Sequence, residues 1–391
     1  MSQDARGDAD EEKLLTRPFV LLGLAELAYF TSIGVAIYTL PLYATGPIGS
    51  DEAGAGWAYG VFGVTALLCR PFAGRLSDLH GRLPLMIAGA SLAALGMALL
   101  PIADSLALVV GIRVLQGVGE AAFIVASFAL LADIAPPARM GEALSYNSLS
   151  LYLGIALGPP LGEILLERWG FRATWYGATA LAGLAALVAI VIVEPERPRD
   201  GGRAKLIHRP AIAISVGFAT SLVAMGGFLA FVSLYAKDIA MENTSLVLLA
   251  YGAIVVVCRV VFAKVPDRLP SLPLGAASLV AVGAGLSIAA TWRAPEGVVL
   301  GAVILAVGIT FSTPAFFSAV FATASPSERG AASATFTAFM DLGLGVGPIV
   351  LGMVAAARGI PWAFAVGAGI AFAGAIWTVS LTRNPVQQRL S

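Results

Sequence analysis

Apolar runs long enough to cross a membrane follow one another along almost the whole chain. About 20 apolar residues in a helix span the hydrocarbon core of a bilayer, and several runs begin or end at proline or glycine, as helices do. The runs cover residues 18–43, 54–72, 84–102, 106–132, 140–166, 174–193, 211–235, 246–263, 272–290, 297–322, 331–356 and 361–381. The sequence therefore predicts an all-α polytopic membrane protein with twelve transmembrane helices.

The composition also indicates that lipid is the solvent. Hydrophobic residues make up 58% of the 391 residues and charged residues 12%, whereas about 25% of a soluble domain is charged. The formal net charge is zero, which argues against a large basic face and hence against nucleic acid as a partner. Cys69 and Cys258 belong to no CxxC or His/Cys cluster, so we expect neither a structural disulfide nor a metal site.

Basic residues are unevenly distributed among the segments between the runs. Cytoplasmic segments of membrane proteins carry an excess of Lys and Arg. If the N-terminus is cytoplasmic, most basic residues fall on the inside, many of them in the linker EPERPRDGGRAKLIHRP. The outer segments then hold only Arg168, Arg172, Lys237, Arg293 and Arg358. We expect a multi-pass protein of the cell inner (cytoplasmic) membrane with both termini in the cytoplasm.

The second half of the chain repeats landmarks of the first half at a constant offset of 189 residues. Cys69-Arg70 falls on Cys258-Arg259, and Gly158-Pro159 falls on Gly347-Pro348. Such internal repeats are common in transporters, which bind substrate between the two halves. The predicted organisation is a tail (1–17), a six-helix bundle (18–193), a linker (194–210), a second six-helix bundle (211–381) and a tail (382–391).

The stretch GRLSDLHGRLPL, residues 74–85, resembles the loop motif G-x-L-x-D-x-x-G-R-x-x-x-L of the major facilitator superfamily. Over nearly its whole length the chain resembles the 12-helix drug:proton antiporters of that superfamily. The resemblance implies a cytoplasmic gate in which Asp78 meets the start of the run 331–356 and Arg82 pairs with Asp133. Alternatively, the loop arginines only fix the topology. The implied gate residues are Gly74, Asp78, Gly81, Arg82 and Asp133.

Ionisable residues inside the runs are candidates for proton coupling, because each costs about 2.5–3.5 kcal/mol at bilayer depth on insertion scales. Arg113 and Glu120 are seven residues apart and so share one helix face. Glu26 and Asp341 lie in the runs 18–43 and 331–356. Burial in a dry cavity disfavours a charged carboxylate and a nearby arginine favours it, which is the response that proton coupling needs.

The segment RVLQGVGEA resembles the superfamily motif R-x-x-x-Q-G loosely, and this resemblance implies a role for Arg113 in proton transfer. The alternatives are structural: a buried arginine that binds helix carbonyls, and a glutamate at position 26 that reaches the membrane surface. Glu163 stands near the outer end of the run 140–166, where we expect it to be solvated.

Two glycine- and proline-rich segments, LGIALGPPLGE and GLGVGPIVLG, resemble the antiporter motif of exporters in this superfamily. Glycines four residues apart let helices approach closely, and proline bends a helix. We therefore expect a bend where the two halves meet. The motif residues are Gly154, Gly158, Pro159 and Gly162 in the first half, with Gly343, Gly347 and Pro348 in the second.

Aromatic residues on the runs predicted to surround the substrate favour bulky amphipathic compounds, especially cations attracted by Glu26 and by aromatic faces. Ordinary packing is the alternative role for each of them. The candidates are Glu26, Tyr29, Tyr38, Gln116, Phe123, Asn147, Tyr152, Phe228, Phe317, Phe336 and Met340.

Together these patterns predict a secondary active transporter. Our first hypothesis is a proton-coupled antiporter, active as a monomer in lipid, that exports small amphipathic or drug-like molecules by alternating access. It would need no cofactor besides the proton gradient. The alternatives are an exporter of a polar metabolite, such as a sugar or siderophore, and a non-transporting receptor. We expect no enzyme, because His80 and His208 both lie outside the runs.

Overall fold

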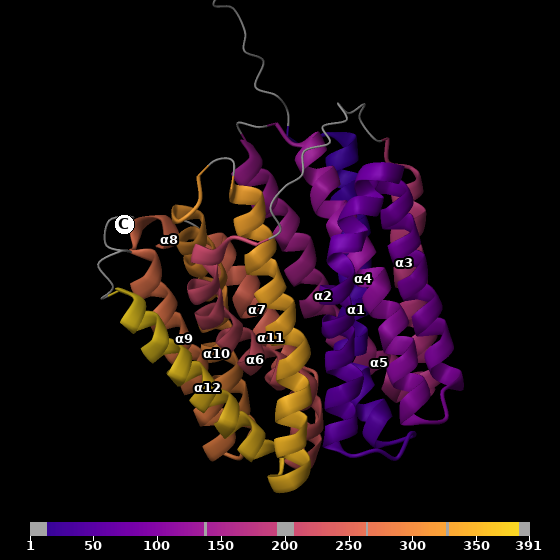
Figure 1. The fold of residues 1–391 in the computed structure, drawn as a ribbon. Coiled ribbons are helices and arrows are strands. Elements are labelled where there is room, and N and C mark those ends of the chain that lie inside the picture. The colour runs from indigo at the N-terminus through magenta and orange to yellow at the C-terminus, as the bar shows by residue number, and fades with distance from the viewer. Residues whose placement is uncertain (1–13, 137–138, 194–206, 263–264, 326–327, 383–391) are drawn as a thin grey trace, which may run out of the picture.

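The structure, a computed structural model, describes residues 14–136, 139–193, 207–262, 265–325 and 328–382. Within these ranges every regular element is a helix (Figure 1). In chain order they are α1 (Arg17–Thr45), α2 (Glu52–His80), α3 (Arg82–Leu99), η1 (Leu100–Ile102), α4 (Leu106–Ile134), α5 (Met140–Ile190), α6 (Arg209–Asp238), α7 (Leu246–Val261), α8 (Val265–Arg268), α9 (Ser271–Thr291), α10 (Pro295–Ala322), α11 (Arg329–Arg358) and α12 (Ile360–Thr382).

The predicted class, an all-α protein with many membrane spans, is confirmed. In the described part of the chain, 9 helices are long and apolar enough to cross a membrane. α7 is an apolar helix of only 16 residues, and α2, with 29 residues, ends in the charged stretch that contains Arg75 and Asp78. Every one of the apolar runs predicted from the sequence coincides with one of these helices or with an arm of α5.

α5 departs from the expected pattern. The runs 140–166 and 174–193, expected as two helices joined by an outer loop, lie in one 51-residue helix that is broken at Gly170. Gly170 has φ 75° and ψ 178°, a backbone conformation that only glycine adopts readily. The chain folds back there without a loop, since Gly177 after the break packs against Leu165 before it. The two arms of α5 therefore supply the two predicted spans.

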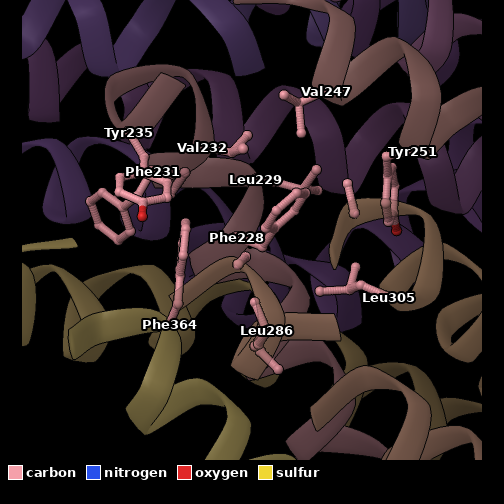
Figure 2. Close-up of a cluster of buried hydrophobic side chains, with 14 of the residues drawn as sticks. Phe228, Leu229, Phe231, Val232, Tyr235, Val247, Tyr251, Leu286, Leu305 and Phe364 are labelled. Carbon is pink, nitrogen blue, oxygen red and sulfur yellow. The ribbon is translucent and has the colours of Figure 1, made fainter. Parts of the chain in front are cut away.

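The helices form two bundles that stand side by side, α1–α5 and α6–α12 (Figure 1). We call the end where α1 begins and α12 finishes the terminal end, and the opposite end the far end. In the first bundle α1 lies along α5, and in the second α6 lies along α11. The largest buried core belongs mainly to the second bundle and continues into α1 through Tyr38 and Leu42. Figure 2 shows the part of it around Phe228, Tyr235 and Phe364.

The two bundles meet most closely toward the far end. There α2 crosses α11 through small residues, and a Cβ placed on Gly63 would lie 3.1 Å from the Cα of Gly345. At the same end the hydroxyl groups of Tyr38 and Thr244 are 2.7 Å apart, which joins α1 to the segment before α7. The two bundles are thus in contact with each other at the far end.

Candidate functional site

Arg113 lies in the first third of α4 and is only 4% exposed. Its Nε donates to the carbonyl oxygen of Ala58 on α2 at 2.9 Å, and a terminal nitrogen donates to Oε1 of Gln116 at 2.7 Å. Its guanidinium carbon also stands 4.3 Å from the centre of the Phe62 ring. The contact to a helix carbonyl, which we named as the structural alternative, is therefore present, and it fixes the cation between α2 and α4.

Glu120 follows two turns later on the same helix face. Its Oε2 accepts a hydrogen bond of 2.7 Å from the hydroxyl of Tyr29, and the Tyr29 ring stacks on Phe123 with centroids 3.9 Å apart. Arg70, Arg113 and Asp341 all lie close enough to act electrostatically on Glu120. These four charged side chains from α2, α4 and α11 form what we call the central charge cluster.

Arg70 and Asp341 complete that cluster and join the two bundles. A terminal nitrogen of Arg70 donates to Oδ1 of Asp341 at 2.8 Å, and Nε of Arg70 faces Oδ2. The side chains are 18% and 7% exposed. The sequence analysis singled out Asp341 but missed Arg70 as a functional residue. The repeat carried the signal, because Cys69-Arg70 recurs as Cys258-Arg259.

Glu26 lies apart from the central charge cluster, inside the first bundle. It is 1% exposed, so it does not reach the membrane surface. Ser127 of α4 and Asn147 of α5 face its carboxylate, but the Ser127 hydroxyl donates to the carbonyl of Ile124 instead. Both carboxylate oxygens are buried without a hydrogen-bond partner in the described structure. Glu26 therefore lies among α1, α4 and α5 inside the first bundle and not between the bundles.

Glu163 is not solvated, and that expectation is wrong. The residue is 7% exposed, and its carboxylate accepts hydrogen bonds at the start of α7 in the other bundle. Oε1 accepts from the backbone N–H of Thr244 at 2.8 Å, and Oε2 accepts from the Ser245 hydroxyl at 2.5 Å. Tyr38 adds a third donor at 3.0 Å. An anion at a helix N-terminus is stabilised by free N–H groups and the helix dipole, so Glu163 ties the bundles together at the far end.

The loop motif forms part of the gate geometry that the resemblance implies. Gly81 has φ 105° and ends α2 just before α3 begins, a conformation that favours glycine. Nε of Arg82 lies 3.2 Å from Oδ2 of Asp133, so the expected pair is present. Asp78 instead bonds Arg82 at 2.5 Å, with its side chain 71% exposed, and the expected seat on α11 is not formed by the described residues. Gly74 has open space around it.

The antiporter-motif glycines pack against a helix of their own bundle, on segments that also touch the other bundle through Ala156 and Pro348. Gly154 and Gly158 of α5 abut Gly34 of α1, and a Cβ on Gly34 would lie 2.8 Å from the carbonyl oxygen of Gly154. The second-half motif does the same with α6. Gly343 and Gly347 abut Ala219, Leu222 and Val223 of α6. In the first half, Gly162 faces Tyr38 and Thr39 of α1. The carbonyl of Pro348 faces Gly56 of α2 in the other bundle. Pro159 lies inside α5.

Most of the aromatic candidates are core residues of a single bundle. Phe228 is fully buried, with its ring centroid 6.0 Å from that of Tyr251 (Figure 2). Phe336 stacks on Phe218 at 4.3 Å, and Phe317 and Met340 pack against the same cluster. Tyr38 and Tyr152 differ, because both contact the opposite bundle. The aromatic candidates are thus divided among three buried clusters.

Comparison with known proteins identifies the family to which this architecture belongs. The family model described as Major Facilitator Superfamily matches residues 22–325 and 245–391. The chain belongs to the Major Facilitator Superfamily. It is 28% identical over 365 residues to an uncharacterized MFS-type transporter of Salmonella typhimurium, with 88% of this chain and 92% of the relative covered. Against the uncharacterized MFS-type transporter YhhS of Escherichia coli strain K12 the identity is 26% over 380 residues, with 94% and 93% covered.

Solved structures share the fold at low identity. The nucleoside transporter NupG superposes with a TM-score of 0.77 at 16% identity, covering 93% of this chain and 99% of its own. The human organic anion transporter MFSD10 gives 0.71 at 16% identity, covering 92% and 98%. The protein is thus a multi-pass membrane transporter of this superfamily. Three residues that hold its bundles together, Arg70, Glu163 and Arg259, were missed as functional residues because a single sequence does not show which helices of the two bundles touch.

Proposed function

We propose that this transporter is a proton-coupled antiporter that exports small amphipathic molecules across the inner membrane by alternating access. The observation that carries the proposal is the partly buried ion pair between Arg70 and Asp341. It links α2 of one bundle to α11 of the other and lies beside Glu120 and Arg113. A transporter that alternates between two openings must break and remake links of this kind.

A proton on Asp341 would convert the ion pair into a weaker neutral contact. Attraction between unit charges is strong where the surroundings exclude water, so the loss of one charge changes the link by a large fraction. Arg70, once released, stays near Glu120, which offers a second carboxylate within the same cluster. Protonation of Asp341 and separation of the bundles are coupled in this way, and the positive charge of Arg70 still has Glu120 as a nearby carboxylate.

Glu26 is the second proton site in this proposal. Its two carboxylate oxygens are buried without a hydrogen-bond partner in the described structure. A buried polar group without a hydrogen bond costs roughly 2–7 kcal/mol, and a buried charge costs more. A proton removes that cost. The resemblance of two segments to the antiporter motif supports export as the direction of transport.

Transport by everted membrane vesicles tests the proposal. Vesicles are acidified inside, and uptake is followed for amphipathic fluorescent dyes that are cationic, neutral or anionic. Wild type should accumulate at least one dye, and an uncoupler should abolish the accumulation. Asp341→Asn should lose gradient-driven accumulation but keep dye-for-dye exchange, because a permanently neutral side chain still permits substrate exchange. Arg113→Ala and Glu26→Gln should lose gradient-driven accumulation too.

Glu296→Gln is the matched control, since Glu296 is an exposed carboxylate in the first turn of α10. It should transport as wild type does. The coupling claim fails if uptake by wild type is indifferent to the uncoupler. It also fails if Asp341→Asn accumulates dye as wild type does.

A further inference from the structure

Arg259 of α7 occupies the position of Arg70 in the second half of the repeat, and it makes the mirrored contact. Arg70 reaches across to residue 341 on α11, and Arg259 reaches across to residue 152 on α5. Positions 341 and 152 are themselves separated by the repeat offset. The two arginines therefore form equivalent bridges between the bundles, one on each side of the internal pseudo-symmetry axis.

The partners of the two arginines differ in charge. Arg70 pairs with the carboxylate of Asp341. At the equivalent place Arg259 donates to the hydroxyl of Tyr152 at 2.7 Å, and its guanidinium carbon lies 4.1 Å from the centre of that ring. A phenol and its ring accept a hydrogen bond and attract a cation, but they do not cancel its charge. Arg259 thus remains an uncompensated cation among the contacts that the structure describes.

Unused hydrogen-bonding groups surround this cation. Nε of Arg259 is buried without a hydrogen-bond acceptor, and the hydroxyl of Tyr251 is buried without any partner in the described structure. Tyr251 is 1% exposed, and it lies close to Arg259, Tyr152 and Tyr59. A guanidinium edge and a phenolic hydroxyl both donate, so together they present donors and a positive charge to the same region.

We propose that Arg259, Tyr152 and Tyr251 bind the acidic group of the transported molecule, so that the substrates are amphipathic organic anions, carboxylates foremost. This assignment rests on the proposed transport function and names its substrate class. The guanidinium fork matches a carboxylate in two parallel hydrogen bonds, and the aromatic rings nearby cover the apolar part of such a molecule. Glu26, the residue on which the sequence-based preference for cations depends, is enclosed in the first bundle.

Equilibrium binding to the purified full chain in lipid nanodiscs tests this assignment without any gradient. The probes share one naphthalene core and differ in charge: 2-naphthylacetate, its neutral carboxamide and 2-naphthylethylamine. Wild type should bind the carboxylate about tenfold or more tightly than the carboxamide, which corresponds to one charge-assisted contact of at least about 1.4 kcal/mol. The amine should bind most weakly.

The variants locate the preference. Arg259→Gln should abolish it by weakening carboxylate binding far more than carboxamide binding, and Tyr251→Phe should weaken carboxylate binding several-fold. Tyr152→Asp copies the arrangement of Arg70 and Asp341, so it should also remove the preference in a chain that still folds. Arg358→Gln, at an exposed arginine that ends α11, is the control and should bind as wild type does.

The remaining outcomes separate the anion site from the proposed antiport. Equal binding of carboxylate and carboxamide by wild type refutes it, even if proton-driven dye transport is observed, in which case the proposed function stands alone. Competition by the anionic lipid phosphatidylglycerol that depends on Arg259, with no binding of 2-naphthylacetate, would identify a lipid phosphate as the occupant instead. Conversely, an Arg259-dependent preference for the carboxylate together with proton-independent transport keeps the anion site and refutes the antiport.

Discussion

Among single residues, Glu163 joins the two bundles at the far end through its carboxylate. Its carboxylate accepts hydrogen bonds from Tyr38 of its own bundle and from Thr244 and Ser245 of the other. Because these donors converge on the start of α7, the link depends on negative charge as well as on hydrogen-bonding geometry. Opening the far end requires all of these contacts to break together.

Glu163→Gln should therefore favour the state that is open at the far end. Hydrogen bonds to a charged group contribute about 1.5–3 kcal/mol each, so losing the charge should raise the open population by about tenfold or more. Spin labels on cysteines placed at the exposed positions Arg168 and Glu242, in a background without the native cysteines, report the distance across this end. The distribution should shift to longer distances.

Glu167→Gln is the control for that measurement, because Glu167 is an exposed carboxylate one helical turn from Glu163. It should leave the distance distribution unchanged. Identical distributions for Glu163→Gln and wild type would mean that the carboxylate does not hold the far end closed.

At the scale of elements, the contact between α1 and α5 depends on backbones that touch. Gly34 lies against Gly154 and Gly158, with a Cβ on Gly34 coming within 2.9 Å of the Gly158 Cα. The glycine spacing in the sequence predicted a close helix approach, and the structure has one. The sequence could not identify the partner helix, since the spacing marks a smooth face without stating what packs on it.

Gly158→Val should push α1 away from α5 and destabilise the first bundle. Overpacking a well-packed core costs roughly 1–3 kcal/mol, and here the new side chain meets backbone, which has little room to move. We expect a lower apparent melting temperature of the detergent-solubilised protein, measured by fluorescence-detected size-exclusion chromatography.

Gly183→Ala provides the comparison, because a Cβ at Gly183 in α5 meets nothing within 4 Å. Alanine favours helix over glycine by about 1 kcal/mol, so the melting temperature should stay equal or rise. If the two variants have the same apparent melting temperature, the close contact of α1 and α5 is not needed for stability.

At the scale of the whole molecule, the arginine and lysine distribution predicts that the terminal end faces the cytoplasm. Two exposed positions test this orientation: His80, the last residue of α2, at the terminal end, and Asp104, between η1 and α4, at the far end. In a chain without native cysteines, Asp104→Cys should react with a membrane-impermeant maleimide added to intact cells. His80→Cys should react only in everted vesicles, and the reverse pattern would invert the proposed topology.

The sequence by itself determined the class of the protein and much of its charge chemistry. Apolar length and composition dictate helices in lipid because backbone groups must be bonded within each span. Arg113, Glu120 and Asp341 were recognisable because charge at bilayer depth is costly. Positions in a repeat can also be aligned by counting residues, which is how Arg70 and Arg259 are seen to be equivalent.

Only the tertiary structure decided which of these residues meet. The partner of Arg70 is 271 residues away and that of Glu163 is 82 residues away, and no local pattern encodes such contacts. The same packing buries Glu26 inside the first bundle and Phe228 in a core to which both bundles contribute. It leaves Arg259 facing a tyrosine where its counterpart faces an aspartate. Helix periodicity fixes the face on which a side chain lies, but the neighbour on that face follows from how twelve spans pack together.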